Sequence, residues 1–289
     1  MPEAILPAHR HLPPLPFTPD RPLVFIGGGN MASAILGGLV RQGLPAQAVR
    51  VVEPFEAARE RLRQEFGVSA QASAGPQLRT AALVVWAVKP QTFREAADQA
   101  RPHLGDTLHL SVAAGIRSDS IAAWTGSQAI VRAMPNTPAL VGRGITGLFA
   151  RGDVPAAGRA TVEQVIATTG EHVWVEQEAH LDAVTALSGS GPAYVFLFLE
   201  SMIQAGTEMG LSAAQARQLA IATFSGASEL ARQSDESPQV LRERVTSKGG
   251  TTFAALTSMQ QDQVAAAFVR AMHAACQRAA QLGDEFGSA

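Results

Sequence analysis

The sequence is poor in charge, in aromatic residues and in cysteine. Only 17% of its 289 residues are charged, 6% are aromatic, and the formal net charge is −2. A nucleic-acid-binding chain carries a basic excess or an array of stacking aromatics, so this class of protein is excluded. The single cysteine, Cys276, excludes an internal disulfide and fits a reducing compartment.

Long uncharged apolar runs are also missing. No run of about 18 apolar residues without a charge occurs, so we expect no transmembrane helix. Residues 1–20 are rich in proline and lack the apolar core of a signal peptide, so we expect a flexible extension there. The histidines show no spacing typical of metal ligands. These absences predict a soluble, cytoplasmic protein with no metal, no membrane partner and no nucleic-acid partner.

The sequence does contain enough apolar material for a sizeable core, at 46% hydrophobic residues. In the first half, buried-strand patterns alternate with segments of helical or loop-like composition, which predicts a doubly wound parallel sheet. The predicted strands are Leu23–Ile26, Val49–Glu53, Leu83–Val88, Thr107–Val112, Ala129–Met134 and Ile145–Ala150. The segments between them include Glu56–Phe66, Thr92–Ala100 and Ser118–Trp124.

The first predicted strand runs directly into a glycine-rich turn and a helical pattern. Gly27, Gly29 and Ala32 form Gly-x-Gly-x-x-Ala, the fingerprint of a Rossmann-like dinucleotide-binding domain. Ligands of such sheets bind beyond the carboxyl ends of the strands, so we expect the cofactor there. The expected contacts are Ile26, Gly27, Gly29, Asn30, Met31, Glu53, Ala87, Val88, Lys89, Pro90, Ala113, Ala114, Gly115 and Asn136. The alternative to a cofactor contact is a simple close-packed turn for residues 113–115 and a solvated side chain for Lys89.

Glu53 closes the second predicted strand, where an acidic residue accepts hydrogen bonds from the adenosine ribose. By itself it favours NAD over NADP, because a 2′-phosphate would face a like charge. Arg59 and Arg61 follow on the next predicted helix and would offset that charge. The preference between the two cofactors therefore stays open.

The second half of the chain, from about residue 178, has a helical pattern. The stretch 194–203 is almost uniformly apolar, and alanine-rich segments follow at Ala213–Leu230 and Val264–Leu282. Helices that are apolar all round are buried in a core or between subunits, which predicts a bundle that dimerises. Two small-residue loops precede helices, at Leu187–Ala193 and Val245–Thr252, and both offer backbone N–H groups that suit an anion. An ordinary helix N-cap is the alternative for the second loop.

With these segments assembled, the chain resembles the pyrroline-5-carboxylate reductase family. The motifs that carry the resemblance run in the family's order from about residue 23 to 283. They are Phe25–Ala32, Ala87–Gln91, Ser111–Gly115, Arg132–Ala139, Leu187–Tyr194 and Val245–Thr252. One departure is Lys248, where the family usually has proline.

The resemblance implies a Rossmann-like domain at residues 21–178 and an all-α domain for substrate binding and dimerisation at 179–289. It implies reduction of 1-pyrroline-5-carboxylate to L-proline, the last step of proline biosynthesis, with NADPH as the usual donor and NADH sometimes accepted. The partners implied are a small cyclic imine carboxylate and a second copy of the chain, as a homodimer or a larger ring of dimers.

The same resemblance implies the substrate site. The substrate carboxylate would bind backbone N–H groups around Gly249, Gly250 and Thr251, near Ser247, and Thr252 would be the catalytic residue that hydrogen-bonds the ring nitrogen. Glu178 matches a further substrate contact. Two alternatives stand beside this interpretation: an NADP-dependent reductase of another cyclic imine or a hydroxy acid, and a nucleotide-sensing homologue without turnover.

Overall fold

The computed structural model of the chain describes residues 15–152 and 154–287. These residues form two compact units. The first holds the described residues up to Gly189 together with those from Cys276 onward, and the second is Ser190–Ala275. Most of the predicted proline-rich extension, residues 1–20, lies outside the described residues.

The described residues of the first unit contain an eight-stranded sheet in the order β3-β2-β1-β4-β5-β6-β7-β8. The strands are β1 (Leu23–Ile26), β2 (Val49–Val52), β3 (Ala70–Gln71), β4 (Leu83–Trp86), β5 (Leu108–Ser111), β6 (Ile130–Met134), β7 (Gly144–Ala150) and β8 (Gly170–Trp174). All six predicted strands are confirmed, with small differences at their ends. The sequence pattern missed β3 and β8, which flank the sheet.

The sheet is parallel except where β6 meets β7, which pair antiparallel from Val131–Ala150 to Met134–Gly147. The connection between these strands contains only a short 3-10 helix, Thr137–Val141. A parallel pairing needs a longer crossover, so the chain has to turn back. The prediction of a parallel sheet did not foresee this reversal.

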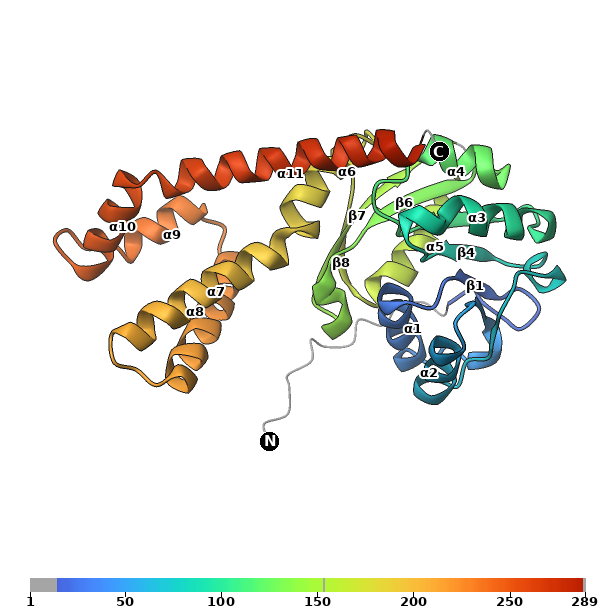
Figure 1. Ribbon diagram of the computed structural model, residues 1–289, viewed down its shortest axis with the longest axis horizontal. Helices are drawn as coiled ribbons and strands as arrows, with labels where there is room; N and C mark the ends of the chain where they lie inside the picture. The colour runs from blue at the N-terminus through green and yellow to red at the C-terminus, as the bar shows by residue number, and fades with distance from the viewer. Residues whose placement is uncertain (1–14, 153, 288–289) are drawn as a thin grey trace. The chain divides into compact units, whose positions relative to one another are not determined.

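Helices cover both faces of the sheet (Figure 1). Side chains alternate along each strand, so Leu23 and Phe25 pack with one helical layer, and Val24 and Ile26 pack with the other. The first layer is α1 (Asn30–Arg41), α2 (Glu56–Phe66) and α5 (Ala156–Ala167), and the second is α3 (Pro90–Ala100) and α4 (Ser118–Thr125). Short 3-10 helices lie at Ala46–Ala48, Pro76–Leu78 and Arg101–His103.

The helical unit is built from α7 (Gly191–Glu208), α8 (Ala213–Gln233), α9 (Pro238–Arg244), α10 (Thr251–Gln261) and the first half of α11 (Val264–Gly287). Ser212 begins α8 with a capping box to Gln215. The preceding α6 (His180–Val184) continues into a π-helix, Thr185–Gly189. The small-residue segment around Ser188 is therefore helical, and its prediction as a loop was wrong.

The helical unit buries few of its apolar side chains. Within Ser190–Ala275, all of which is described, Ala216 and Ala220 are the buried hydrophobic residues. Phe196 and Leu197 of α7 are 58% and 60% exposed. One aromatic group does pack inside the unit, where the Phe268 ring lies 5.5 Å from Tyr194 and 5.9 Å from Phe198.

One helical stretch of the described residues, His180–Glu208, is long and apolar enough to cross a membrane by length and composition alone. The sequence analysis did not select this stretch, because it required an uninterrupted run of about 18 apolar residues without a charge. A large exposed apolar face is also typical of a subunit interface.

His109 of β5 is a buried histidine whose neutral form the fold requires. The indole N–H of Trp86 donates to its Nδ1 over 3.0 Å, and its Nε2 has no hydrogen-bond partner among the described residues. Burial lowers the pKa of His109 to about 4.

We expect His109 to make the fold sensitive to acid. Below pH 6.5 the unfolded chain takes up a proton that the folded chain takes up only near pH 4. As the pH falls through this window the free energy of unfolding should therefore decrease, by about 2 kcal/mol at pH 5 and about 3 kcal/mol at pH 4. Urea unfolding at pH 7.5 and 5, at one protein concentration, measures this loss. His109→Gln, which keeps an acceptor for Trp86, should lose less, and an equal loss in both proteins would contradict the assignment.

Candidate functional site

The glycine-rich turn after β1 is pressed against the end of β4. Gly27 has φ +97°, and a Cβ there would lie 2.6 Å from the carbonyl oxygen of Ala87. At Gly29, by contrast, a Cβ would meet no described atom within 4 Å. Gly29 is also the N-cap of α1, without a side-chain cap. Open space beside a helix N-terminus suits a pyrophosphate, so the residues present fit a dinucleotide.

The carboxylate of Glu53 fixes this turn to the end of β2. Its Oε2 accepts from the N–H of Gly28 over 2.8 Å, and its Oε1 accepts from the N–H of Phe55 over 2.9 Å. Arg61 donates to the carbonyl oxygen of Gly28 over 3.0 Å, so the turn is held from two sides. Arg59 donates to the carbonyl oxygen of Glu53 over 3.0 Å. Because Glu53 is buried and bonded twice, its carboxylate is fixed beside the glycine turn.

The other predicted cofactor segments gather at the same edge of the sheet. Strands β2, β1, β4, β5 and β6 are neighbours and parallel, so their carboxyl ends coincide. Backbone hydrogen bonds extend past the strand ends: Ala87 N–H donates to Ile26 and Val112 N–H donates to Trp86. Lys89 is the N-cap of α3, with Pro90 in the first turn. The sheet thereby brings together the segments that the sequence predicted.

Two predicted cofactor residues have structural partners as well. The side-chain oxygen of Asn136 accepts from the N–H of Ile145 over 3.0 Å, which ties the β6–β7 connection. Gly115 has φ +72°, and a Cβ there would lie 3.2 Å from Leu282 and Phe286 of α11. The turn at 113–115 is thus close-packed on one side, as its alternative interpretation expected.

The predicted substrate loop belongs to the helical unit. Gly249 has φ +77°, which suits glycine, and the N–H of Gly250 donates to the carbonyl oxygen of Ser247 over 3.0 Å. Helix α10 begins at Thr251, with Gly250 as an N-cap that makes no side-chain hydrogen bond. Neither Thr251 nor Thr252 therefore caps the helix, and the first-turn N–H groups stay available to an anion.

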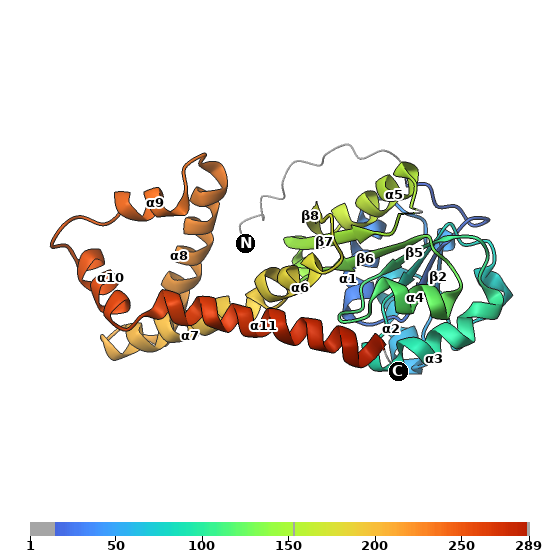
Figure 2. The same ribbon diagram turned by 90° about the horizontal axis from the view of Figure 1, so that it is seen from above.

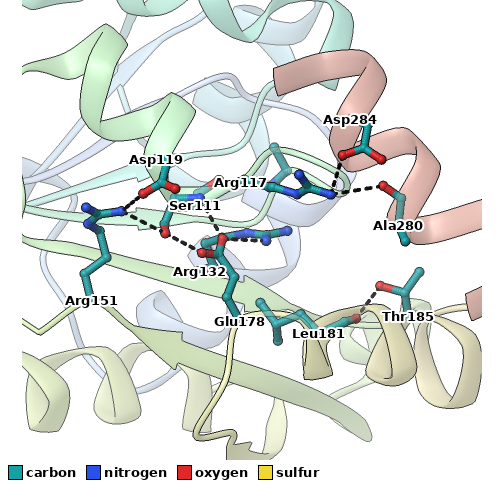
Figure 3. A network of polar contacts seen from close by, with 12 residues as sticks. Ser111, Arg117, Asp119, Arg132, Arg151, Glu178, Leu181, Thr185, Ala280 and Asp284 are labelled. Carbon is teal, nitrogen blue, oxygen red and sulfur yellow. Dashed lines mark hydrogen bonds and ion pairs between the residues drawn. The ribbon is translucent and has the colours of Figure 1, made fainter. Parts of the chain in front are cut away.

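The predicted substrate contact Glu178 lies in the first unit and is heavily engaged there (Figure 3). Its Oε1 accepts from the N–H of Ser118 over 2.6 Å and from Arg132 over 2.8 Å, and its Oε2 accepts from the Ser118 hydroxyl over 2.6 Å. Arg151 donates to the same hydroxyl over 3.2 Å. Nearby, burial raises the pKa of Asp182, while the charges of Arg132 and Arg117 oppose that rise.

Sequence reasoning selected Glu178 but missed its partners. A signal was present, because Arg132 is a charged residue inside a predicted buried strand. A buried guanidinium needs an anionic partner, although the sequence does not say which one.

A glycine turn fixed by an acidic residue, at the carboxyl edge of a parallel sheet, defines the class of dinucleotide-dependent oxidoreductases. Residues 22–115 match the family profile described as NADP oxidoreductase coenzyme F420-dependent, and residues 178–282 match the profile described as pyrroline-5-carboxylate reductase dimerisation.

Full-length relatives agree with these two matches. The chain is 41% identical to a pyrroline-5-carboxylate reductase of Pseudomonas aeruginosa, over 92% of this chain and 98% of that protein. It is 39% identical to the enzyme of that name from Haemophilus influenzae, over 91% of this chain and 98% of that protein. The chain belongs to the pyrroline-5-carboxylate reductase family.

Solved structures give the same result. The structure of a pyrroline-5-carboxylate reductase from Coxiella burnetii superposes with a TM-score of 0.85 at 34% identity, covering 91% of this chain and 98% of that one. The Plasmodium falciparum pyrroline carboxylate reductase, solved with NADP bound, gives a TM-score of 0.82 at 29% identity with the same coverage.

We expect Glu53→Ser to raise the ratio of kcat/KM for NADPH to that for NADH. Removing one fixed like charge near a solvent-facing 2′-phosphate is worth about 1 kcal/mol, or roughly fivefold. Steady-state kinetics with both cofactors measures the ratio. Glu65→Ser, which removes an exposed charge from the far end of α2, is the matched control. An unchanged ratio in Glu53→Ser would mean that the carboxylate serves only the turn.

Proposed function

We propose that this protein reduces 1-pyrroline-5-carboxylate to L-proline with NAD(P)H. The observation that carries the proposal is the match over the whole length of the relatives, with both the glycine turn and the Ser247–Thr252 loop intact. We further propose a soluble, cytoplasmic enzyme with a nucleotide-binding domain at 21–178 and a helical domain at 179–289. Two described segments of that helical domain, 179–189 and 276–287, belong to the first compact unit.

When bound, NAD(P)H supplies the hydride that adds to the C=N carbon of the imine. The two electrons of the hydride form the new C–H bond, the C=N π pair moves to nitrogen, and the nitrogen keeps the proton of the iminium. The open N-terminus of α1 binds the pyrophosphate, and Glu53 accepts from the adenosine ribose. The predicted contacts at Ala113–Gly115 and Asn136 hold the nicotinamide.

The loop before α10 binds the substrate in this proposal. The N–H groups of Gly249 and Thr251 receive the carboxylate at a helix N-terminus, where partial positive charge favours it. The N–H of Gly250 donates to the carbonyl oxygen of Ser247 and holds the turn. Ser247 lies in the same turn, and the Thr252 hydroxyl donates to the lone pair that forms on the ring nitrogen as the hydride adds. The protonated imine accepts hydride readily, so orientation and charge placement supply most of the acceleration.

The direct test is NADPH and NADH oxidation by the purified protein with pyrroline-5-carboxylate. We expect saturable oxidation and formation of proline. Turnover with another cyclic imine or a hydroxy acid alone would favour a different substrate, and cofactor binding without any turnover would favour a nucleotide-sensing role.

We expect Thr252→Ala to lower kcat by about 10²-fold, because it removes one preorganised donor. Its melting temperature should barely change, since Gly250 rather than Thr252 is the N-cap of α10. Thr251→Ala is the matched control, because it makes the same change one residue earlier and keeps the backbone N–H. Equal losses of kcat in the two variants, or full turnover in Thr252→Ala, would contradict the catalytic role.

We also propose that the exposed face of α7 is covered by a second copy of the chain, as a homodimer or a ring of dimers. The apolar side chains concerned include Phe196, Leu197 and Met202, and the profile match at 178–282 is to a dimerisation domain.

Light scattering at assay concentrations should therefore find a dimer or a larger assembly. Leu197→Asp should shift the protein toward monomer and lower turnover, because a charge on a buried interface is costly. A monomer with full activity would contradict this assembly.

A further inference from the structure

The aromatic ring of Phe55 is exposed at the edge of the sheet where the cofactor is expected. Phe55 is 73% exposed, whereas every other phenylalanine and tryptophan in the described part of the first unit is buried or half-buried. It is the N-cap of α2 and follows the end of β2 by only a few residues. Single exposed apolar residues are common at protein surfaces, so the exposure gains meaning from its place.

The backbone around Phe55 is fixed by hydrogen bonds on both sides. Its N–H donates to Oε1 of Glu53 over 2.9 Å, and its carbonyl oxygen accepts from the N–H groups of Ala58 and Arg59 over 3.1 Å each. The Arg59 side chain donates to the carbonyl oxygen of Pro54 over 2.6 Å, and the proline ring restricts the backbone further. The exposed ring is therefore carried on an ordered main chain.

The order of groups along this edge matches the order of groups in an adenine dinucleotide. Oε2 of Glu53 accepts from the N–H of Gly28 in the glycine turn, and Oε1 of the same carboxylate accepts from Phe55. A dinucleotide with its pyrophosphate on the turn at Gly29 and its ribose on Glu53 brings its adenine next, toward Phe55. Helices α1 and α2, which begin at these two places, lie side by side in both views (Figures 1 and 2).

The chemistry of this segment favours stacking on a base over hydrogen bonding to its edge. The side chains of Pro54 and Phe55 carry no polar atoms, and the N–H of Phe55 is already bound to Glu53. The carbonyl oxygens of Glu53 and Pro54 accept from Arg59. An aromatic side chain binds a base through its face, and every base offers such a face.

We propose that Phe55 stacks on the adenine of NAD(P)H, and that this protein recognises the face of the base rather than its edge. The inference rests on the proposed function only for the class of cofactor, and it needs no imine. One consequence is that loss of the ring weakens every ligand with an adenosine half. A second is that hypoxanthine, which has the same two-ring face and a different edge, replaces adenine.

The test is the dissociation constants of ADP-ribose and of its 2′-phosphate, measured by isothermal titration calorimetry. The proteins are the wild type, Phe55→Ala, and Phe55→Tyr, which keeps the ring. Val173→Ala is the matched control, because it shortens another exposed apolar side chain, on β8 at the opposite end of the sheet order from β3. Thermal melting is recorded for each protein. Binding of NADH and of its hypoxanthine analogue to the wild type is compared by fluorescence.

We expect both dissociation constants to rise about tenfold in Phe55→Ala and to stay within about twofold of the wild type in Phe55→Tyr and in the control. Melting temperatures should barely move, because the ring is mostly in solvent and Phe55 makes no side-chain cap. NADH and its hypoxanthine analogue should bind within about threefold of each other.

Unchanged binding in Phe55→Ala would overturn the proposal, and so would equal losses in Phe55→Ala and Phe55→Tyr. A strong preference for NADH over its hypoxanthine analogue would overturn it too, because the edge of the base is then recognised. Wild-type protein that binds neither ADP-ribose nor its 2′-phosphate would likewise contradict it. Binding is read without turnover, so a protein that binds these ligands as expected and does not reduce pyrroline-5-carboxylate contradicts the proposed function alone.

Discussion

The stability of the helical unit depends on covering its exposed apolar surface, and the assembly and the substrate loop depend on that unit. Within Ser190–Ala275 the side chains of Phe196 and Leu197 stay exposed, and the buried hydrophobic residues are two alanines. Burying one large apolar side chain contributes about 1.5–3 kcal/mol, so a helical unit without a partner lacks most of the stabilisation that a folded domain needs. A second copy of the chain supplies the missing core in our account. The predicted substrate loop belongs to this unit, so its order depends on the same assembly.

The first unit is organised differently, because its sheet has a complete core on both faces. Its binding surface is made mostly of backbone, at the glycine turn and the helix starts, and carboxylates hold that backbone in place. Glu53 holds Gly28 and Phe55, and Glu178 holds Ser118. Each carboxylate accepts from N–H donors, which offset the cost of taking its oxygens out of water. Both carboxylates therefore bind the backbone of the site in this structure.

The sequence predicted the features that depend on local pattern. Strand β1 and helix α2 have the predicted bounds, because alternation and helical spacing act over a few residues. Glu53 lies at the glycine turn as the fingerprint requires. The reversal between β6 and β7 was missed, since it depends on the length of one connection. The end of the π-helix, residues 187–189, was predicted as the start of a loop, because its small residues are also typical of turns. The partners of Glu178 were missed because they lie 46 and 60 residues away in the sequence.

The most direct test of the account is urea unfolding at several protein concentrations, followed by far-UV circular dichroism of the helices. If the helical unit completes its core with a second chain, the unfolding midpoint rises as the protein concentration rises, because dissociation and unfolding are coupled. The account would be contradicted if the midpoint stayed constant over about a hundredfold range of protein concentration while light scattering showed a monomer.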